Sequence, residues 1–168
     1  MEFEKVIKER FSTRMFKTTK IKEEDLKKIL EAGRLAPTAK NLQPQKIYVI
    51  QTEEGLNKID KITPCRYNAQ TCLLVCSDKN IAWTNENYSS YEMDACIVAT
   101  HMLLEATNIG INNIWIRMFK REEVQKEFNL KENIIPICII PLGYKKEECK
   151  PSPLHTIRKD IKETVEYI

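Results

Sequence analysis

One apolar stretch, residues 91–109, limits what this chain of 168 residues can fold into. It reads YEMDACIVATHMLLEATNI and predicts one helix of roughly five turns. Its apolar residues cover most of the circumference, and a helix of that kind has to be buried on most sides. A single domain of this length has one core and few elements with which to surround a central helix. We therefore expect a second copy of the chain to cover part of it, with Val98 and Met102 as interface-facing positions.

The overall charge is mild. The chain has 27 Lys and Arg residues against 24 Asp and Glu residues, a net charge of +3, with both signs interspersed. This is unlike the basic stripe of a nucleic-acid-binding protein, and no apolar run reaches the roughly 18 residues of a membrane span. The N-terminus, MEFEKVIKERF, is charged and lacks the apolar segment of a secretory signal. We expect a cytoplasmic protein that binds neither nucleic acid nor membrane.

The six cysteines do not form a metal-binding pattern. None belongs to a CxxC pair and the chain has only two histidines, so we expect no structural zinc and no other metal. Most of the cysteines lie in apolar runs such as CLLVC and PICIIP, where buried thiols are common. Reduced thiols fit a cytoplasmic setting better than a disulfide framework does.

Helical and strand patterns alternate along the chain. We expect helices over residues 2–9, 23–34, 53–62, 91–109 and 120–128, and strands over 46–51, 71–77, 113–118 and 134–142. This order predicts an α/β fold, or an α+β fold with a mixed sheet. No domain boundary is evident, so residues 1–168 form one domain in which 144–168 is a C-terminal arm. The arm has a proline-rich stretch followed by an amphipathic helix or strand, and we expect it to embrace a partner subunit.

Several well-known catalytic and nucleotide-binding signatures are missing. With four glycines in all, the chain has neither GxGxxG nor GxxxxGK, and no GxSxG occurs. Cys96 and His101 share the central helix, but five residues place them about 140° apart around its axis. A Cys–His nucleophile pair is therefore not expected, and Cys96 is interpreted as a core residue.

Two segments have the composition of a ligand site. In Arg10-Phe11-Ser12-Thr13-Arg14, two guanidinium groups flank a hydroxyl, a combination suited to phosphate, although a solvated basic loop has the same composition. Residues 37–45 contain Thr38, Asn41 and Gln43, which either hydrogen-bond a heterocycle or cap a helix and a turn.

The order of the motifs resembles a known family. R-x-S-x-R is followed by a helix and by A-P-T-A-x-N-x-Q-P, then by DACIVATHMLLEA, NIGINNIWI, PLGY and KPSPLHTIRK. Over nearly the whole chain this is similar to the nitroreductase family of FMN-dependent oxidoreductases, in the short form common among anaerobic bacteria. The resemblance implies a nitroreductase-like α+β fold with a central mixed sheet flanked by helices. It also implies an intertwined, obligate homodimer with two FMN molecules at the interface, and NADH or NADPH as a transient hydride donor that needs no Rossmann domain.

The resemblance also implies roles for individual residues. The first segment would contact the FMN phosphate, ribityl chain and pyrimidine edge, the loop would close over the flavin of the other subunit, and 116–118 would lie beside the isoalloxazine ring. Basic residues of the arm would lie near the phosphate. The residues so implied are Arg10, Phe11, Ser12, Arg14, Pro37, Thr38, Ala39, Asn41, Ile116, Arg117, Met118, Arg158 and, less directly, Lys159.

The resemblance predicts chemistry carried by the cofactor. Flavin N5 would accept a hydride from NAD(P)H and pass electrons to a nitroaromatic, quinone or similar small acceptor by a ping-pong mechanism, so we name no catalytic residue. Lys40, where many members have glycine, and Gln45, where many have tryptophan, depart from the family pattern, and Arg117 is bulky and basic for its position. A lysine in the loop would favour anionic acceptors. Two alternatives stay open: an FMN carrier or redox sensor without turnover, and a small α/β interaction module without a ligand.

Overall fold

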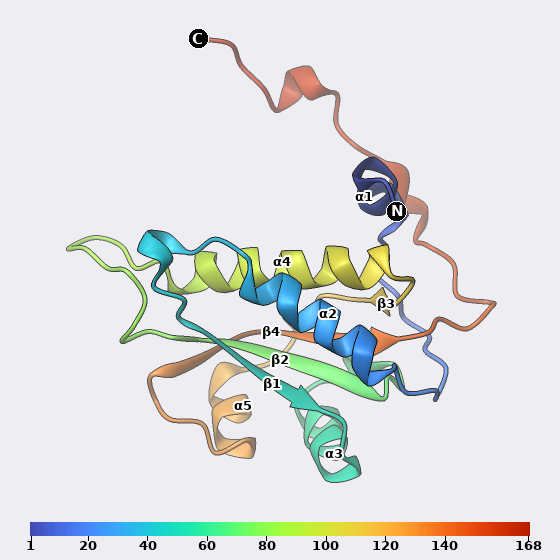
Figure 1. Cartoon of the computed structure of the whole chain (residues 1–168), viewed down its shortest axis with the longest axis horizontal. Coiled ribbons are helices and arrows are strands. Elements are labelled where there is room, and N and C mark those ends of the chain that lie inside the picture. The colour runs from blue at the N-terminus through green and yellow to red at the C-terminus, as the bar shows by residue number, and fades with distance from the viewer.

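A four-stranded sheet separates two layers of helices in the computed structural model, which describes all residues 1–168 (Figure 1). The strands are β1 (Gln45–Ile50), β2 (Thr71–Asp78), β3 (Asn112–Asn113) and β4 (Ile134–Gly143), in the order β1-β2-β4-β3. The helices are α1 (Phe3–Glu9), α2 (Glu23–Arg34), α3 (Glu53–Ile62), α4 (Tyr91–Asn108) and α5 (Arg121–Glu127). α2 and α4 cover one face of the sheet, and α3 and α5 cover the other. The predicted α+β class is confirmed.

The sheet is antiparallel and not mixed, so that detail of the prediction is wrong. Every ladder between the named strands is antiparallel, and the only parallel pairing is a single bridge between Ser12 and Asn113. Hydrophobic periodicity reports which side chains are buried, and it carries no information about strand direction.

Alternation along the buried strands divides the core into two clusters. Leu73 and Val75 of β2 pack toward α2 and α4, whereas Leu74 and Cys76 pack on the side of α3 and α5. Because both faces of the central strands are covered, β2 and β4 are almost continuously apolar.

The inner face of α4 is buried within one protomer. Val98, Ala99 and Met102 have no exposed surface. Gly33 of α2 permits this close approach, since a Cβ atom there would lie 2.8 Å from Met102 Cγ. The expectation that Val98 and Met102 face a subunit interface is therefore wrong, because the protomer's own α2 and sheet occupy that side.

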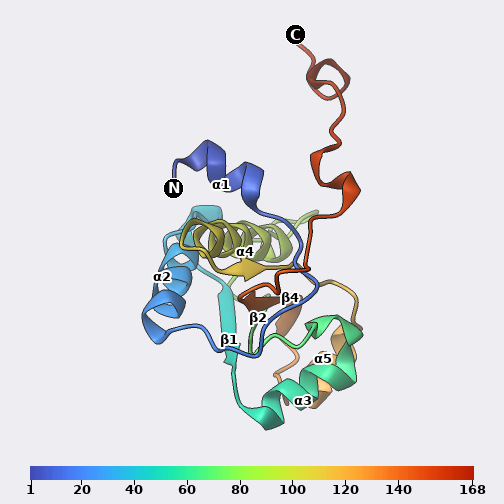
Figure 2. The ribbon, with the colours of Figure 1, turned by 90° about the vertical axis from the view of Figure 1, so that its right-hand side faces the viewer.

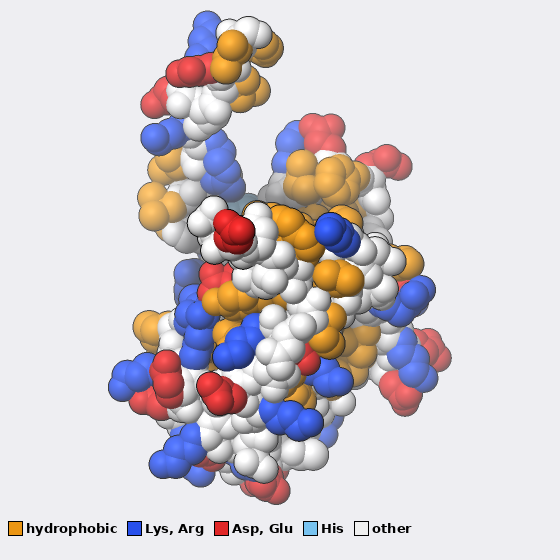
Figure 3. Space-filling model, turned by 90° about the vertical axis from the view of Figure 1, so that its left-hand side faces the viewer, with side chains coloured by type: hydrophobic (Ala, Val, Ile, Leu, Met, Phe, Trp, Pro, Cys, Tyr) orange, Lys and Arg blue, Asp and Glu red, His pale blue; other side chains and the backbone are white.

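The outer face of α4 is apolar at four positions and polar at Thr100 and His101. Residues spaced by three and four along it form one stripe, which we call the outer stripe: Met93, Cys96, Ile97, Thr100, His101 and Leu104. Met93 is 56% exposed, and the middle of the stripe borders shallow hollows. α1 and the C-terminal segment project on this side of the molecule (Figure 2). Seen from the end of the molecule, hydrophobic side chains gather beneath these projecting segments (Figure 3).

Most predicted elements lie within two residues of their expected bounds, and two do not. The expected strand 113–118 is reduced to β3, because the chain then leaves β4 and pairs with it again only at Ile116 and Ile139. The amphipathic element expected in the arm is one turn of 3-10 helix, Ile161–Glu163, with an exposed Ile161. An isolated segment of this length has no surface to pack on and does not form a stable helix alone.

None of the helices combines the length and apolar character needed to cross a membrane. All six cysteines are free thiols, and no cluster of three or more His, Cys, Asp or Glu side chains is arranged to hold a metal ion.

Candidate functional site

A pocket of about 270 Å³ lies at the C-terminal end of α4, and we call it the arginine pocket. It is lined by Arg10, Phe11, Ser12, Arg14, Ser152, Leu154, His155 and Arg158. The structure thus brings all four predicted residues of the first segment together with one predicted basic residue of the arm. Lys159 is exposed next to Arg158 and does not line the pocket.

Asn113 fixes the N-terminal wall of the pocket. Thr13 N–H donates to the Asn113 carbonyl over 3.0 Å, and the Asn113 side-chain amide donates to the Leu103 carbonyl of α4 over 3.0 Å. The segment that carries the arginines is therefore tied through β3 to the last turns of the central helix.

The C-terminal arm closes the opposite wall. Ser152 caps the single-turn helix Pro153–Thr156 by accepting from Leu154 N–H over 3.2 Å. His155 Nε2 lies 3.0 Å from the Lys8 carbonyl, and its ring meets Phe11 edge-on at 6.2 Å between centroids. Since a carbonyl only accepts, Nε2 carries the proton in this contact.

The pocket is positively charged without a compensating acid. Arg10, Arg14 and Arg158 have no carboxylate within 4.0 Å, whereas Arg34 and Arg66 elsewhere are each paired with one. Burial lowers the pKa of Arg10, and the charge of Arg158 lowers it further. Two facing cations that partly lose their solvent favour a bound anion, and guanidinium groups match phosphate geometry.

Two buried oxygens beside the pocket have no hydrogen-bond partner within the chain. They are Thr13 Oγ1 and Asn113 Oδ1. Buried polar groups are normally paired, so these atoms leave bonding capacity for a ligand or water. The arginines of the pocket and these two oxygens together fit a ligand that has a phosphate at one end and further polar atoms along its length.

The predicted loop lies at the other end of α4. Ala39 N–H donates to Asp94 Oδ1 over 2.8 Å, and Asp94, which is 1% exposed, also accepts from Ser90 Oγ over 2.7 Å. Thr38 Oγ1 accepts from Gln43 N–H over 3.0 Å. Pro37 and Asn41 are exposed. Within one protomer, this loop and the chain segments that line the arginine pocket lie at opposite ends of α4, so the structure does not bring the loop to the pocket (Figure 1).

The segment 116–118 divides its side chains between core and surface. Ile116 is packed in the core beside α3 and α5. Arg117 is exposed, with its guanidinium 4.9 Å from the centroid of the Phe119 ring, and Met118 is 59% exposed. Only Arg117 and Met118 are therefore available to a ligand.

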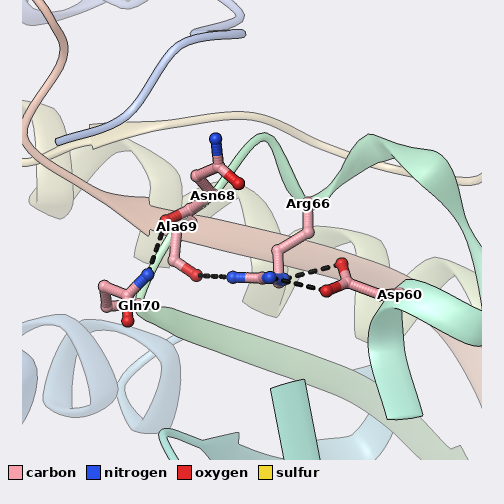
Figure 4. A network of polar contacts seen from close by, with 5 residues as sticks. All are labelled: Asp60, Arg66, Asn68, Ala69 and Gln70. Carbon is pink, nitrogen blue, oxygen red and sulfur yellow. Dashed lines mark hydrogen bonds and ion pairs between the residues drawn. The ribbon is translucent and has the colours of Figure 1, made fainter. Parts of the chain in front are cut away.

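One turn near the pocket was not predicted, and of its two left-handed residues only Asn68 is of a type that often adopts this conformation. Tyr67 and Asn68 have φ of 53° and 66°, the left-handed region that glycine normally occupies. Arg66 holds the turn by donating to both Asp60 oxygens, over 2.7 and 2.5 Å, and to the Ala69 carbonyl over 2.9 Å, while Asn68 points away from this pair (Figure 4).

This turn also touches the arginine pocket. The pKa of Tyr67 is raised by its hydrogen bond to Cys65 and by burial, against an opposing effect of Arg14.

His155 is a second residue that sequence reasoning missed. Its only signal was its position within KPSPLHTIRK, beside the predicted Arg158.

Comparison with known proteins identifies the class to which this fold belongs. The nitroreductase family description matches residues 7–65 and 63–144, which together span most of the chain. The chain belongs to the nitroreductase family, an enzyme family, as predicted.

Individual relatives agree with this assignment. A protein of Archaeoglobus fulgidus assigned as an NADH dehydrogenase/NAD(P)H nitroreductase is 32% identical over 151 residues, 86% of each chain. The crystal structure of a nitroreductase family protein from Clostridium difficile has a TM-score of 0.93 and 36% identity, covering 99% of this chain and 98% of its own. A nitroreductase from Exiguobacterium sibiricum in complex with FMN has a TM-score of 0.86 at 20% identity, covering 100% and 98%, and shows the shared fold.

Proposed function

We propose that this chain is an FMN-dependent oxidoreductase that transfers electrons from NADH or NADPH to a small aromatic or quinone acceptor. The observation that carries the proposal is the arginine pocket, in which three guanidinium groups converge without an acid. Family membership supports it, as do the NAD(P)H-linked assignment of the archaeal relative and the FMN bound to the Exiguobacterium protein.

The residues present fit this cofactor. Arg10, Arg14 and Arg158 would hold a phosphate dianion, with Ser12 as a neutral donor. Thr13 Oγ1 and Asn113 Oδ1 would meet polar atoms of the ligand further along. No carboxylate in the pocket repels the phosphate.

The chain binds and orients and does not perform acid–base chemistry. FMN, when bound, supplies reversible two-electron transfer. The arginines fix the phosphate end, and exposed Met118 offers an apolar side chain where the resemblance places the ring. The Tyr67–Asn68 turn, fixed by Arg66, keeps a rigid wall beside Arg14.

We further propose a homodimer with composite sites. α1 borders the outer stripe only at its C-terminal end, beside His101 and Leu104, and the part from Met93 to Thr100 has no cover in the protomer. Large exposed apolar patches mark interfaces. A twofold axis crossing the middle of α4 pairs the helix with its copy in antiparallel fashion. The N-terminal end of one α4 then meets the C-terminal end of the other, so the loop 37–41 of one subunit lies beside the arginine pocket of its partner.

The positions of other unpaired buried oxygens support this arrangement. Gln45 Oε1, Ser77 Oγ and Ser89 Oγ lack partners and belong to the sheet end and connection next to the loop. Thr13 and Asn113 belong to the pocket end. The arm also carries exposed apolar residues that would pack on the partner subunit: Leu154, Ile157, Ile161 and Val165. Six free thiols fit a reducing cytoplasm.

A visible spectrum of the purified protein tests the function. We expect flavin absorption bands that bleach when NADH or NADPH is added without oxygen and return when 4-nitrobenzoate or a quinone follows. Bands that persist with both donors indicate a flavin carrier. A colourless protein that gains no bands on titration with FMN indicates an interaction module and rejects the proposal.

The kinetics provide a first prediction. One ring face serves donor and acceptor in turn, so product leaves before the second substrate binds. Varying NADH at several fixed acceptor concentrations should therefore give parallel double-reciprocal lines. Intersecting lines mean that both substrates bind together, which a single shared pocket does not allow.

A further inference from the structure

The loop 38–43 places side chains where glycine would be less strained. Lys40, Asn41 and Gln43 have φ of 50°, 55° and 51°. A non-glycine residue in this region is sterically disfavoured, and such residues concentrate at functional sites. This strain makes the side chain of Lys40 a candidate for a functional role.

The Lys40 side chain has a defined position. Its ammonium group lies 5.7 Å from the centroid of the half-buried Trp83 ring, which in turn contacts Tyr88 at 6.2 Å between centroids. A cation over an indole face is attracted to it. The ammonium is therefore held on an aromatic surface formed by the connection between β2 and α4.

Lys40 has no acidic partner within the protomer. No carboxylate lies within 4.0 Å of it, and the two acids of the first turn of α4 are engaged elsewhere. Glu92 pairs with Arg121, and Asp94 accepts from Ala39 and Ser90. The lysine charge is left for a ligand.

A second cation follows the same pattern. The Arg117 guanidinium lies over the Phe119 ring, donates to the Phe119 carbonyl over 3.3 Å and has no carboxylate partner. Both cations are thus fixed on aromatic faces and lack acids, one on the loop and one on the segment 116–118. The acceptor site assembled from these two segments would be positively charged.

We propose that Lys40 is a specificity-determining residue that binds the carboxylate of an anionic aromatic electron acceptor. This inference rests on the proposed function, because it places the loop 37–41 over the flavin of the partner subunit. Trp83, which packs against Tyr88, holds the ammonium at the edge of that site, and the acceptor's ring enters with its carboxylate toward Lys40.

The reaction balances for a nitrobenzoate. Reduction of the nitro group to a nitroso group takes up two electrons and two protons and releases one water. NAD(P)H supplies a hydride, which is equivalent to two electrons and one proton, by way of the cofactor. Solvent supplies the second proton. The carboxylate is unchanged and serves only for binding.

Two substrates that differ only in charge test whether the Lys40 ammonium binds the acceptor's carboxylate. The purified holoenzyme is assayed with 4-nitrobenzoate and with uncharged 4-nitrobenzamide, as wild type and as Lys40→Gln. We expect the ratio of the two kcat/KM values to fall about tenfold in the variant, the size of one charge-assisted hydrogen bond. Lys126→Gln, an exposed lysine on α5 without an ion-pair partner, should keep the wild-type ratio.

Two measurements do not depend on turnover. Calorimetric titration of the holoenzyme with benzoate, which is not reduced, should show binding about tenfold weaker in Lys40→Gln. Lys40→Gly should weaken benzoate to the same extent while raising the thermal midpoint, because glycine relieves the left-handed backbone. Asn129→Gly, at another left-handed position with φ of 48°, should raise the midpoint and leave benzoate binding unchanged.

The outcomes separate the two proposals. An unchanged substrate ratio and unchanged benzoate affinity in Lys40→Gln overturn the role of Lys40 and leave the proposed function intact. A wild-type protein that reduces neither acceptor rejects the proposed function. The comparison of benzoate affinity between wild type and Lys40→Gln then tests by itself whether Lys40 binds a carboxylate.

Discussion

Two left-handed turns without glycine lie toward opposite ends of α4, and they are held very differently. The Tyr67–Asn68 turn is locked by Arg66, which donates two hydrogen bonds to Asp60 and one to the Ala69 carbonyl. The loop that carries Lys40 is attached to α4 by one hydrogen bond from Ala39 N–H to Asp94.

The difference indicates which end of the site is complete in one chain. The arginine pocket has a charge-assisted lock, a closing arm and a rigid wall, so it is preorganised for an anion. The loop is strained and exposed. The neighbouring side-chain oxygens of Gln45 and Ser77 are buried without a hydrogen-bond partner. A partner subunit would supply the missing contacts at this end.

Disrupting the dimer gives the largest expected effect. Ile97→Glu or Leu104→Glu places a charge in the outer stripe, where an unpaired buried charge costs several kcal/mol at an apolar interface. We expect a monomer that loses most of its FMN, because the loop no longer reaches the partner's pocket. Light scattering, with the flavin-to-protein ratio measured on the same sample, checks this.

Val49→Glu provides the matched control, since Val49 is 40% exposed on β1 and lies outside the outer stripe. It should remain a dimer with bound flavin. A wild-type monomer with one FMN per chain refutes the dimer. An Ile97→Glu monomer that retains its flavin leaves the dimer standing and refutes the shared site.

Removing the anion-binding groups has the next largest effect. Arg10→Ala, Arg14→Ala and Arg158→Ala should each weaken FMN binding about tenfold or more, since a hydrogen bond to a charged group contributes about 1.5–3 kcal/mol. Titration of the apo-protein with FMN, followed by fluorescence quenching, measures this. Arg34→Ala, which removes an arginine paired with Glu31, should leave the affinity unchanged. Unchanged affinity in all three pocket variants would rule out the phosphate site.

The contrast between the two ends also explains what the sequence could reveal. Hydrophobic periodicity predicted α2 and α3 with their observed bounds, because both elements have one apolar face toward the core. The five pocket residues in the motifs near each terminus were predicted through the family resemblance. Packing that depends on distant partners was not predicted: Val98 and Met102 turn inward because Gly33 admits α2 closely.

Backbone conformation was the least accessible feature. Nothing in the residue types of Lys40 or Tyr67 indicates left-handed φ, since glycine or asparagine is the usual signal. The direction of the strands and the 3-10 turns of the arm likewise follow from tertiary contacts, or from their absence. Features that arise from local periodicity were predicted, and features imposed by distant contacts were missed.

Weakening the attachment of the loop should have a moderate effect. Asp94→Asn replaces the buried carboxylate, which accepts from Ala39 N–H and Ser90 Oγ, with a neutral amide, so both hydrogen bonds lose their charge assistance. We expect the free energy of unfolding to fall by about 1.5–3 kcal/mol. Urea denaturation measures this, and Ser90→Ala, which removes only one donor, should cost less. Equal stability of Asp94→Asn and wild type contradicts a role for Asp94 as the anchor.

Removing the ion pair between Arg66 and Asp60 at the pocket end should have the smallest effect. In Asp60→Asn, Arg66 keeps its hydrogen bond to Ala69 but loses a charged partner that raises its pKa through their hydrogen bond. Because the Asp60 side chain is 44% exposed, solvent screens the pair, and we expect a loss of about 1 kcal/mol or less. FMN affinity should change less than in Arg14→Ala, since Tyr67 touches the pocket only through Arg14. Urea denaturation and FMN titration of the same preparation decide this. If Asp60→Asn loses more stability than Asp94→Asn, the expected order of the two effects is reversed. The contacts between Arg66 and Asp60 would then contribute more to the stability of the site than the buried Asp94 does.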